Sequence, residues 1–107
     1  MADTPQEYFE EDVIEWMEEE PDAAKAINTI YQFNIEGDDG GTWVLDLTKL
    51  ECREGEDPNA KCTVIVKDAD FMDIVSGKLN PQMAFMSGKL RVEGDMSLAL
   101  KLGDVLG

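Results

Sequence analysis

The stretch "GKLNPQMAFMSGKLRVEGDMSLALKL", residues 77–102, decides the fold because signals that start and stop helices alternate along it at short intervals. Asn80 is a favourable N-cap, and Pro81 suits the first helical position. Gly88 is typical of the position just beyond a helix end. We predict a helix of about two turns here, which is too short to be stable unless tertiary packing holds it.

The segments on either side follow the same logic. Residues 68–77 predict another short helix, with Asp68 or Asp70 as its cap and Gly77 as its stop. Residues 89–94 alternate as a strand does, with Leu90 and Val92 facing inward. Residues 95–106 fit strand alternation or a helix, and we predict a helix because Asp95 is a favourable cap followed by strong helix formers.

The first half of the chain predicts a helix followed by strands. Thr4, Pro5 and Glu7 form a capping signature for a helix over residues 5–19, which we expect Pro21 to end. Alternating residues then predict strands over 29–35, 42–52 and 62–68, all antiparallel, the first two as a hairpin. Residues 53–61 are polar and predict a loop. The expected order is a helix, three antiparallel strands, two short helices, a returning strand and a terminal helix.

Charge and composition exclude several classes of function. The 107 residues hold 24 acidic and 9 basic side chains, a formal net charge of −15, and no histidine. Nucleic-acid binding requires a basic surface, so we expect none. Without histidine, Cys52 and Cys62 make a poor zinc set, and we expect both as free thiols, since pairing would need adjacent strands in register. We expect no metal, no cofactor and no catalytic residues.

Length and hydropathy suggest a single soluble domain. A chain of this size supplies one modest core, so we expect one domain over residues 1–107. No apolar run approaches the roughly 20 residues that span a bilayer, and no basic-then-apolar signal segment begins the sequence. We therefore expect a soluble, acidic, cytoplasmic protein without stable membrane insertion.

Phenylalanine and methionine are concentrated in the second half of the chain. Two phenylalanines and four methionines lie between Phe71 and Met96. These spacings suit a plain core packed by short helices. Methionine is also unbranched and polarizable, and so suits a cavity whose occupant varies in shape. An apolar ligand site is therefore the alternative to a plain core.

Residues 30–105 resemble a known family. "GTWVLDL" at residues 41–47 and "DFMDIVSGKLNPQMAFMSGKLRVEGDMSLALKL" at residues 70–102 are similar, in order and spacing, to the sterol-binding and transfer domain of the sterol carrier protein type two family. The resemblance implies an α+β two-layer sandwich, in which helices over one face of a mostly antiparallel five-stranded sheet enclose a hydrophobic tunnel. It also implies a carrier without catalytic residues, which binds a fatty acid, a fatty acyl-CoA or a sterol-like lipid.

We expect apolar residues of the short helices to line this tunnel, over a floor of two sheet residues. A register error of one residue would turn the floor residues outward. The expected lining consists of Phe33, Leu45, Phe71, Ile74, Val75, Leu79, Met83, Phe85, Met86, Met96, Leu98, Ala99 and Leu102.

Other features leave alternatives open. The same fold could serve as an accessory or interaction module without a transferable ligand, with the C-terminal helix packing on a partner or forming a homodimer. Lys78, Lys89, Arg91 and Lys101 could meet a lipid head group or a CoA phosphate, or simply be solvated. The acidic N-terminal helix should not dock on anionic lipid. The sequence ends "DVLG", so we expect no peroxisomal targeting tripeptide.

Overall fold

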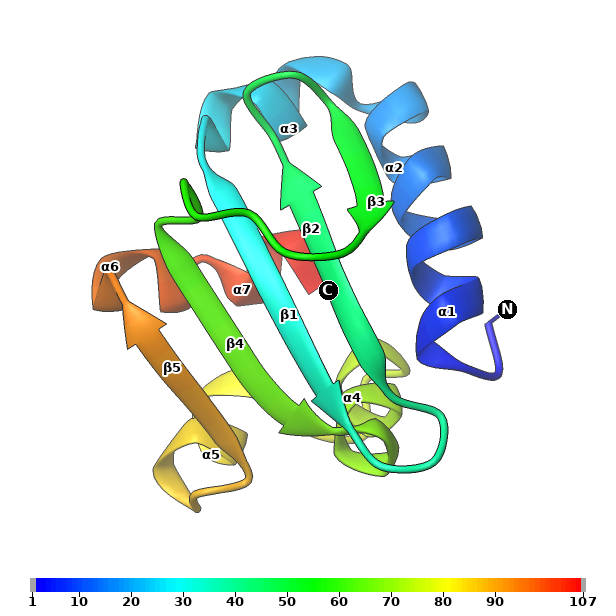
Figure 1. Cartoon of the computed structure of the whole chain (residues 1–107), viewed down its shortest axis with the longest axis vertical. Helices are drawn as coiled ribbons and strands as arrows, with labels where there is room; N and C mark the ends of the chain where they lie inside the picture. Colours follow the sequence, from blue (N-terminus) through cyan, green and yellow to red (C-terminus); the bar gives the residue numbers. More distant parts are fainter. Residues whose placement is uncertain (1, 107) are drawn as a thin grey trace.

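A five-stranded mixed sheet organises the chain, and helices lie behind it (Figure 1). The computed structural model describes residues 2–106. The strands, in the spatial order β3-β2-β1-β4-β5, are β1 (Ile30–Glu36), β2 (Gly41–Asp46), β3 (Glu51–Glu54), β4 (Cys62–Lys67) and β5 (Leu90–Gly94). The helices are α1 (Pro5–Glu7), the π-helical turn η1 (Tyr8–Asp12), α2 (Val13–Glu19), α3 (Pro21–Ile27), α4 (Asp68–Val75), α5 (Pro81–Met86), α6 (Met96–Ala99) and α7 (Leu102–Leu106). None of the described helices is long and apolar enough to cross a membrane.

Two of the strand predictions were wrong in detail. The run 42–52, expected as one strand, is divided into β2 and β3 by a turn. The buried Asp46 forms this turn, since its carboxylate accepts hydrogen bonds from the backbone nitrogens of Thr48 and Lys49. The strand predicted at 62–68 pairs with β1 in parallel, whereas we expected all three strands to be antiparallel. The other three pairings are antiparallel.

The parallel pairing requires the chain to cross the sheet between β3 and β4. Figure 1 shows this loop passing in front of β2 and β1. Its anchor is Gln32, which accepts a hydrogen bond from the backbone nitrogen of Asp57 at 3.0 Å and donates one to Asn34. Gln32 and Val44 are therefore buried although they lie on the face opposite the helices.

The N-terminal helix, which we define as α1, η1 and α2, buries a stripe of residues four apart. These residues are Pro5, Phe9, Val13 and Met17. Three steps of four residues exceed three α-helical turns by about one residue. A π-helical turn accommodates one extra residue, so η1 keeps the stripe facing the sheet. The Thr4 cap is confirmed, since its hydroxyl accepts from the backbone nitrogen of Glu7 at 3.2 Å.

Phe9 is the centre of an aromatic cluster between this helix and the sheet. Its ring centroid lies 5.2 Å from that of Phe33 and 5.3 Å from those of Trp43 and Phe71. Tyr8 packs edge-on to both Phe9 and Phe71. The half of the inner sheet face over β1 and β2 is consequently filled by aromatic rings.

The short helices end where the sequence predicts, and α5 and α6 also begin at the predicted caps. The predicted cap of α4 is wrong, because Lys67 rather than Asp68 or Asp70 is its N-cap and no side chain caps it. The Asn80 side chain accepts from the backbone nitrogens of Gln82 and Met83, and Asp95 accepts from that of Ser97. Gly77 and Gly88 follow α4 and α5 with φ of 84° and 82°, a left-handed conformation that glycine adopts without strain. The predicted terminal helix is present as two pieces, α6 and α7. Pro21 ends α2 as expected, but it also starts α3, which we did not predict.

The inner-face register explains why the cysteines are free. Cys52, Leu45, Tyr31 and Cys62 occupy one row across β3, β2, β1 and β4. Three strand spacings of about 4.8 Å place the cysteine Cα atoms roughly 14 Å apart. A disulfide requires Cα atoms within about 7 Å, so both thiols remain unpaired.

A buried hydrogen bond connects the sheet to the last helices. The Tyr31 hydroxyl donates to the backbone carbonyl of Leu98 in α6 at 2.7 Å. Burial, followed by the nearby Cys62, Asp95 and Asp104, raises the pKa of Tyr31. The hydroxyl therefore remains a neutral donor at any physiological pH, and it fixes the position of α6 over β1.

Removing this hydroxyl should loosen α6. We expect Tyr31→Phe to lower the free energy of unfolding by about 1–2 kcal/mol, because the Leu98 carbonyl loses its buried donor. Urea unfolding measures the change. Tyr8→Phe is the matched control, since the Tyr8 hydroxyl has no hydrogen-bond partner in residues 2–106 and should change stability little. Equal effects of the two substitutions would contradict this role.

The Asp95 cap predicts a pH dependence. Hydrogen bonds from Ser97 hold the pKa of Asp95 below its usual value. A lowered folded-state pKa stabilises the protein above the unfolded value of about 3.9, and this contribution is lost as the pH falls through the folded value. Asp95→Asn keeps the acceptor oxygen without the charge. We expect it to be less stable than wild type at pH 7, with a difference that begins to shrink near pH 4 and vanishes only below the lowered folded-state pKa of Asp95 in urea unfolding.

Glu18→Gln removes the same charge from the exposed, acidic α2. The Glu18 side chain makes no hydrogen bond within the described residues, so this variant should not be destabilised at pH 7. A deficit of Asp95→Asn that persists unchanged under acid would contradict the account.

Candidate functional site

A cavity of about 670 Å³ lies between the short helices at the β5 end of the sheet. We call it the α5–α6 cavity. Its walls come from α5, β5, α6 and the start of α7. The lining residues are Asn80, Pro81, Gln82, Phe85, Leu90, Met96, Ser97, Ala99, Leu100, Leu102 and Gly103.

The helix pitch decides which side of α5 faces this cavity. Ala84 is fully buried, and its small side chain lets α5 approach the sheet closely. Pro81 and Phe85, one turn apart, face the cavity together with Gln82. Leu90 on β5 and Leu102 on α7 are buried and form the deeper part of the wall.

The polar groups of the lining are few and mostly engaged. Asn80 uses its side-chain oxygen to cap α5, and the Ser97 hydroxyl donates to Asp95 at 2.6 Å. No charged side chain belongs to the lining in the described part of the chain. The interior is therefore suited to an apolar occupant.

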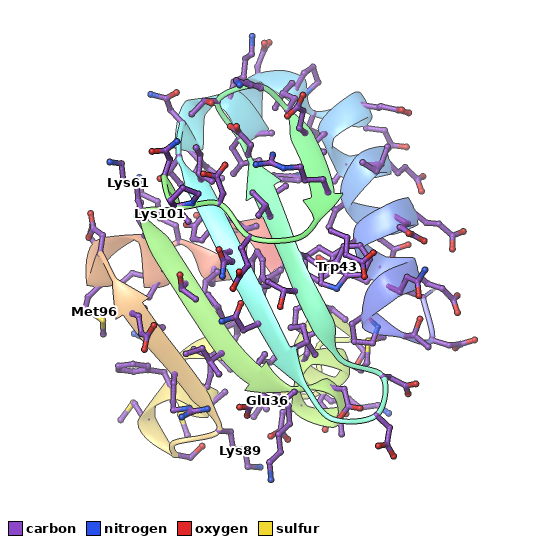
Figure 2. The ribbon with its side chains drawn as sticks, viewed as in Figure 1. Glu36, Trp43, Lys61, Lys89, Met96 and Lys101 are labelled. Carbon is purple, nitrogen blue, oxygen red and sulfur yellow. The ribbon has the colours of Figure 1, made fainter. Side chains whose placement is uncertain are left out.

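Apolar side chains at the mouth of the cavity are exposed to solvent. Phe85 is 41% exposed, Met96 46% and Leu100 74%. Figure 2 shows Met96 at the sheet edge formed by β5, on the side away from Trp43 and the N-terminal helix. An apolar ligand that covered these residues would bury surface that now contacts water.

The structure brings four of the thirteen predicted tunnel residues to this cavity: Phe85, Met96, Ala99 and Leu102. Leu79 is half-buried against the core. Five others are buried in the core itself, namely Phe33, Leu45, Phe71, Ile74 and Leu98. Phe9 occupies the space between Phe33 and Phe71 that a ligand would need.

The remaining three predicted residues lie elsewhere. Met83 and Met86 are exposed on the outer side of α5, which the cavity does not reach. Val75 lines a second hollow of about 310 Å³ with Met72, near Asp12 and Glu15 of the N-terminal helix. This smaller hollow combines two carboxylates with little apolar surface, so it is less suited to a lipid.

Several residues that line the cavity were not predicted as lining residues from the sequence. Leu90 was predicted to face inward but was not assigned to the tunnel. Leu100 lies off the stripe that Leu98 and Leu102 form on a continuous helix. This position was the sequence feature that could have indicated a second apolar surface, and with it the cavity. Asn80 and Pro81 were interpreted only as helix starters, although the same position places them at the cavity.

The described residues offer little reactive chemistry. Burial raises the pKa of Cys62 to about 11 and that of Cys52 to about 12, so neither thiol is a nucleophile near neutral pH. Residues 2–106 contain no cluster of three ligand side chains placed to hold a metal ion. Leu102, Val105 and Leu106 of α7 are buried within the chain itself and so leave little apolar surface for a partner.

Comparisons with known proteins agree with this architecture. The model of the SCP-2 sterol transfer family matches residues 11–107. Hydroxysteroid dehydrogenase-like protein 2 of Xenopus laevis is 44% identical over 89 residues, which are 80% of this chain and 21% of that protein. The chain thus spans about a fifth of the length of the curated relatives it matches.

Two solved structures extend the comparison. Sterol Carrier Protein 2 from Yarrowia lipolytica, in its apo form, is 30% identical with a TM-score of 0.75, over 89% of this chain and 84% of that one. The palmitated SCP2L2 from Aedes aegypti is 29% identical with a TM-score of 0.75, over 94% and 92% of the two chains. The resemblance noted in the sequence is confirmed, and the chain belongs to the SCP-2 sterol transfer family.

Proposed function

We propose that this chain binds and carries one long-chain lipid, a fatty acid or its acyl-CoA thioester, in the α5–α6 cavity. The observation that carries the proposal is a cavity of about 670 Å³ without a charged side chain in its lining. Pockets for small molecules typically measure about 300–1,000 Å³. The palmitated Aedes relative supports a fatty acid as the ligand class. A sterol-like lipid is the other candidate, which competition can test.

The energetics suit a carrier. Burying a chain of about 14 methylenes at about 0.8 kcal/mol each gives a gross gain of about 11 kcal/mol. Association entropy and ordering of the chain oppose much of this gain. Affinity on the order of micromolar remains without any ion pair, and such a ligand is held but can also be released.

The proposed role is non-catalytic. The sequence has no histidine, and the one hydroxyl in the lining, that of Ser97, donates to a carboxylate that caps α6. A serine in this setting has no base to activate it. The activity of the longer dehydrogenase-like relatives is a separate matter, because the chain corresponds to about a fifth of their length. Turnover of acyl-CoA above background would contradict a purely carrying role.

Filling the cavity should prevent binding. We expect delipidated protein to bind one palmitate per chain in native mass spectrometry, and to release a fluorescent fatty acid when palmitate is added. Ala99→Trp places an indole ring in the cavity and should weaken palmitate binding by about tenfold or more. Met86→Trp introduces the same ring on the exposed side of α5 and should bind as wild type does.

Circular dichroism and thermal unfolding confirm that both variants are folded before they are compared. The proposal fails if wild type takes up no palmitate, or if Ala99→Trp binds as tightly as Met86→Trp. Self-association of the delipidated protein in sedimentation, without lipid uptake, would instead favour the interaction module.

A further inference from the structure

We propose that the exposed side chains around the α5–α6 cavity dock on an anionic lipid bilayer, with the mouth of the cavity toward the membrane. This inference rests on the proposed function, because the cavity has to receive its lipid from a membrane or deliver it there. We call the region the mouth surface. It consists of Met83, Phe85, Met86, Met96 and Leu100, together with the exposed Lys78, Lys89 and Lys101, which flank them in the sequence.

The apolar part of this surface is concentrated rather than scattered. All the large hydrophobic side chains that are strongly exposed among residues 2–106 belong to it. Met83 is 59% exposed and Met86 75%, and both lie on the side of α5 away from the buried Ala84. Phe85, Met96 and Leu100 border the cavity itself. Concentrated apolar exposure marks a surface that contacts another apolar phase.

The charge of this region is opposite to that of the rest of the chain. Residues 78–102 contain four bases and two acids, which gives them a net charge of +2. The rest of the chain carries −17, so the two parts together give the total of −15. Arg91 forms an ion pair with Glu36 at 3.1 Å. In the part of the chain that the structure describes, only Arg53 and Arg91 form ion pairs, so Lys78, Lys89 and Lys101 have none. After the hydrogen bonds from Ser97, Lys101 contributes to lowering the pKa of the nearby Asp95, and Lys78 and Lys89 are the bases most available to anionic lipid.

The acidic N-terminal helix is distant from the part of the mouth surface on α5 and β5, although Asp12 and Glu15 share the smaller hollow with Ser76, two residues before Lys78. It packs against β3 at one edge of the sheet, and α5 packs against β5 at the other. Four strand spacings of about 4.8 Å separate these edges by about 19 Å. The Debye length at physiological ionic strength is about 8 Å, so the acidic helix is largely screened at the mouth surface. In Figure 2, Met96, Lys89 and Lys101 lie on the side of the molecule away from the acidic α2.

The arrangement favours a bilayer over a protein partner. Flexible methionines can insert among acyl chains without a shaped counterpart, while flanking lysines meet anionic head groups. The cavity opens within this same surface, so docking would let a lipid pass between bilayer and cavity with little exposure to water. A protein partner would not require the apolar surface to surround a lipid-sized cavity.

Vesicle binding tests the proposal with the full chain. We expect cosedimentation with phosphatidylcholine vesicles containing about a third phosphatidylglycerol, weakened by salt, and little binding to phosphatidylcholine alone. Lys78→Glu with Lys89→Glu should reduce binding by about tenfold or more, as should Met83→Glu with Met86→Glu. The control is Lys25→Glu with Lys49→Glu, which makes the same charge change at exposed positions outside the mouth surface and should bind nearly as wild type does.

Palmitate binding in solution separates this proposal from the previous one. None of the substituted residues lines the cavity, so palmitate affinity should be unchanged in every variant. Normal palmitate binding without vesicle binding overturns the docking proposal alone. Equal losses in the control and the Lys78/Lys89 variant also overturn it, because they would reflect net charge. Absence of palmitate binding overturns the proposed function instead.

Discussion

The packing of Phe9 against the rings of Phe33, Trp43 and Phe71 is the interaction on which the rest of the structure depends. It attaches the N-terminal helix to the sheet and to α4 at once. Aromatic rings bury more apolar area than other side chains, and offset or edge-on contacts add to their stability. The inner face over β1 and β2 is therefore solid. A lipid can be accommodated only over the other half of the sheet.

That other half is covered by helices of four to six residues, which cannot form a continuous wall. Asn80 and Asp95 start α5 and α6, and the Tyr31 hydroxyl holds α6 through the Leu98 carbonyl. These polar contacts set where the helices lie without filling the space between them. The α5–α6 cavity follows from this division of the sheet into an aromatic half and a half covered by short, capped helices.

Several features that depend on local sequence were predicted correctly, although the turn at Asp46 and the helix α3 were missed, and features that depend on distant contacts were not predicted. The caps at Thr4, Asn80 and Asp95 depend on atoms two or three residues away, so the sequence sufficed. The parallel β1–β4 pairing depends on a crossover held by Gln32, 25 residues from Asp57, and no periodicity encodes it. Likewise, Phe33 and Phe71 were expected to line a tunnel because nothing local showed that Phe9 would fill the space between them. Methionine often packs in a core, and we expected Met83 and Met86 to line the tunnel. Because Ala84 marks the side of α5 that faces the core, Met83 and Met86 face the solvent instead.

The location of the lipid is the central claim, and the methionines of the chain can report it. We would label the methionine methyl groups with ¹³C and add a fatty acid that carries a nitroxide spin label, whose paramagnetic broadening is confined to nearby nuclei. Met96 lines the α5–α6 cavity, Met72 lines the smaller hollow, and Met17 is buried on the inner side of the N-terminal helix. The account predicts that the Met96 signal is broadened more strongly than those of Met72 and Met17, whereas strongest broadening at Met72 or Met17 would contradict it.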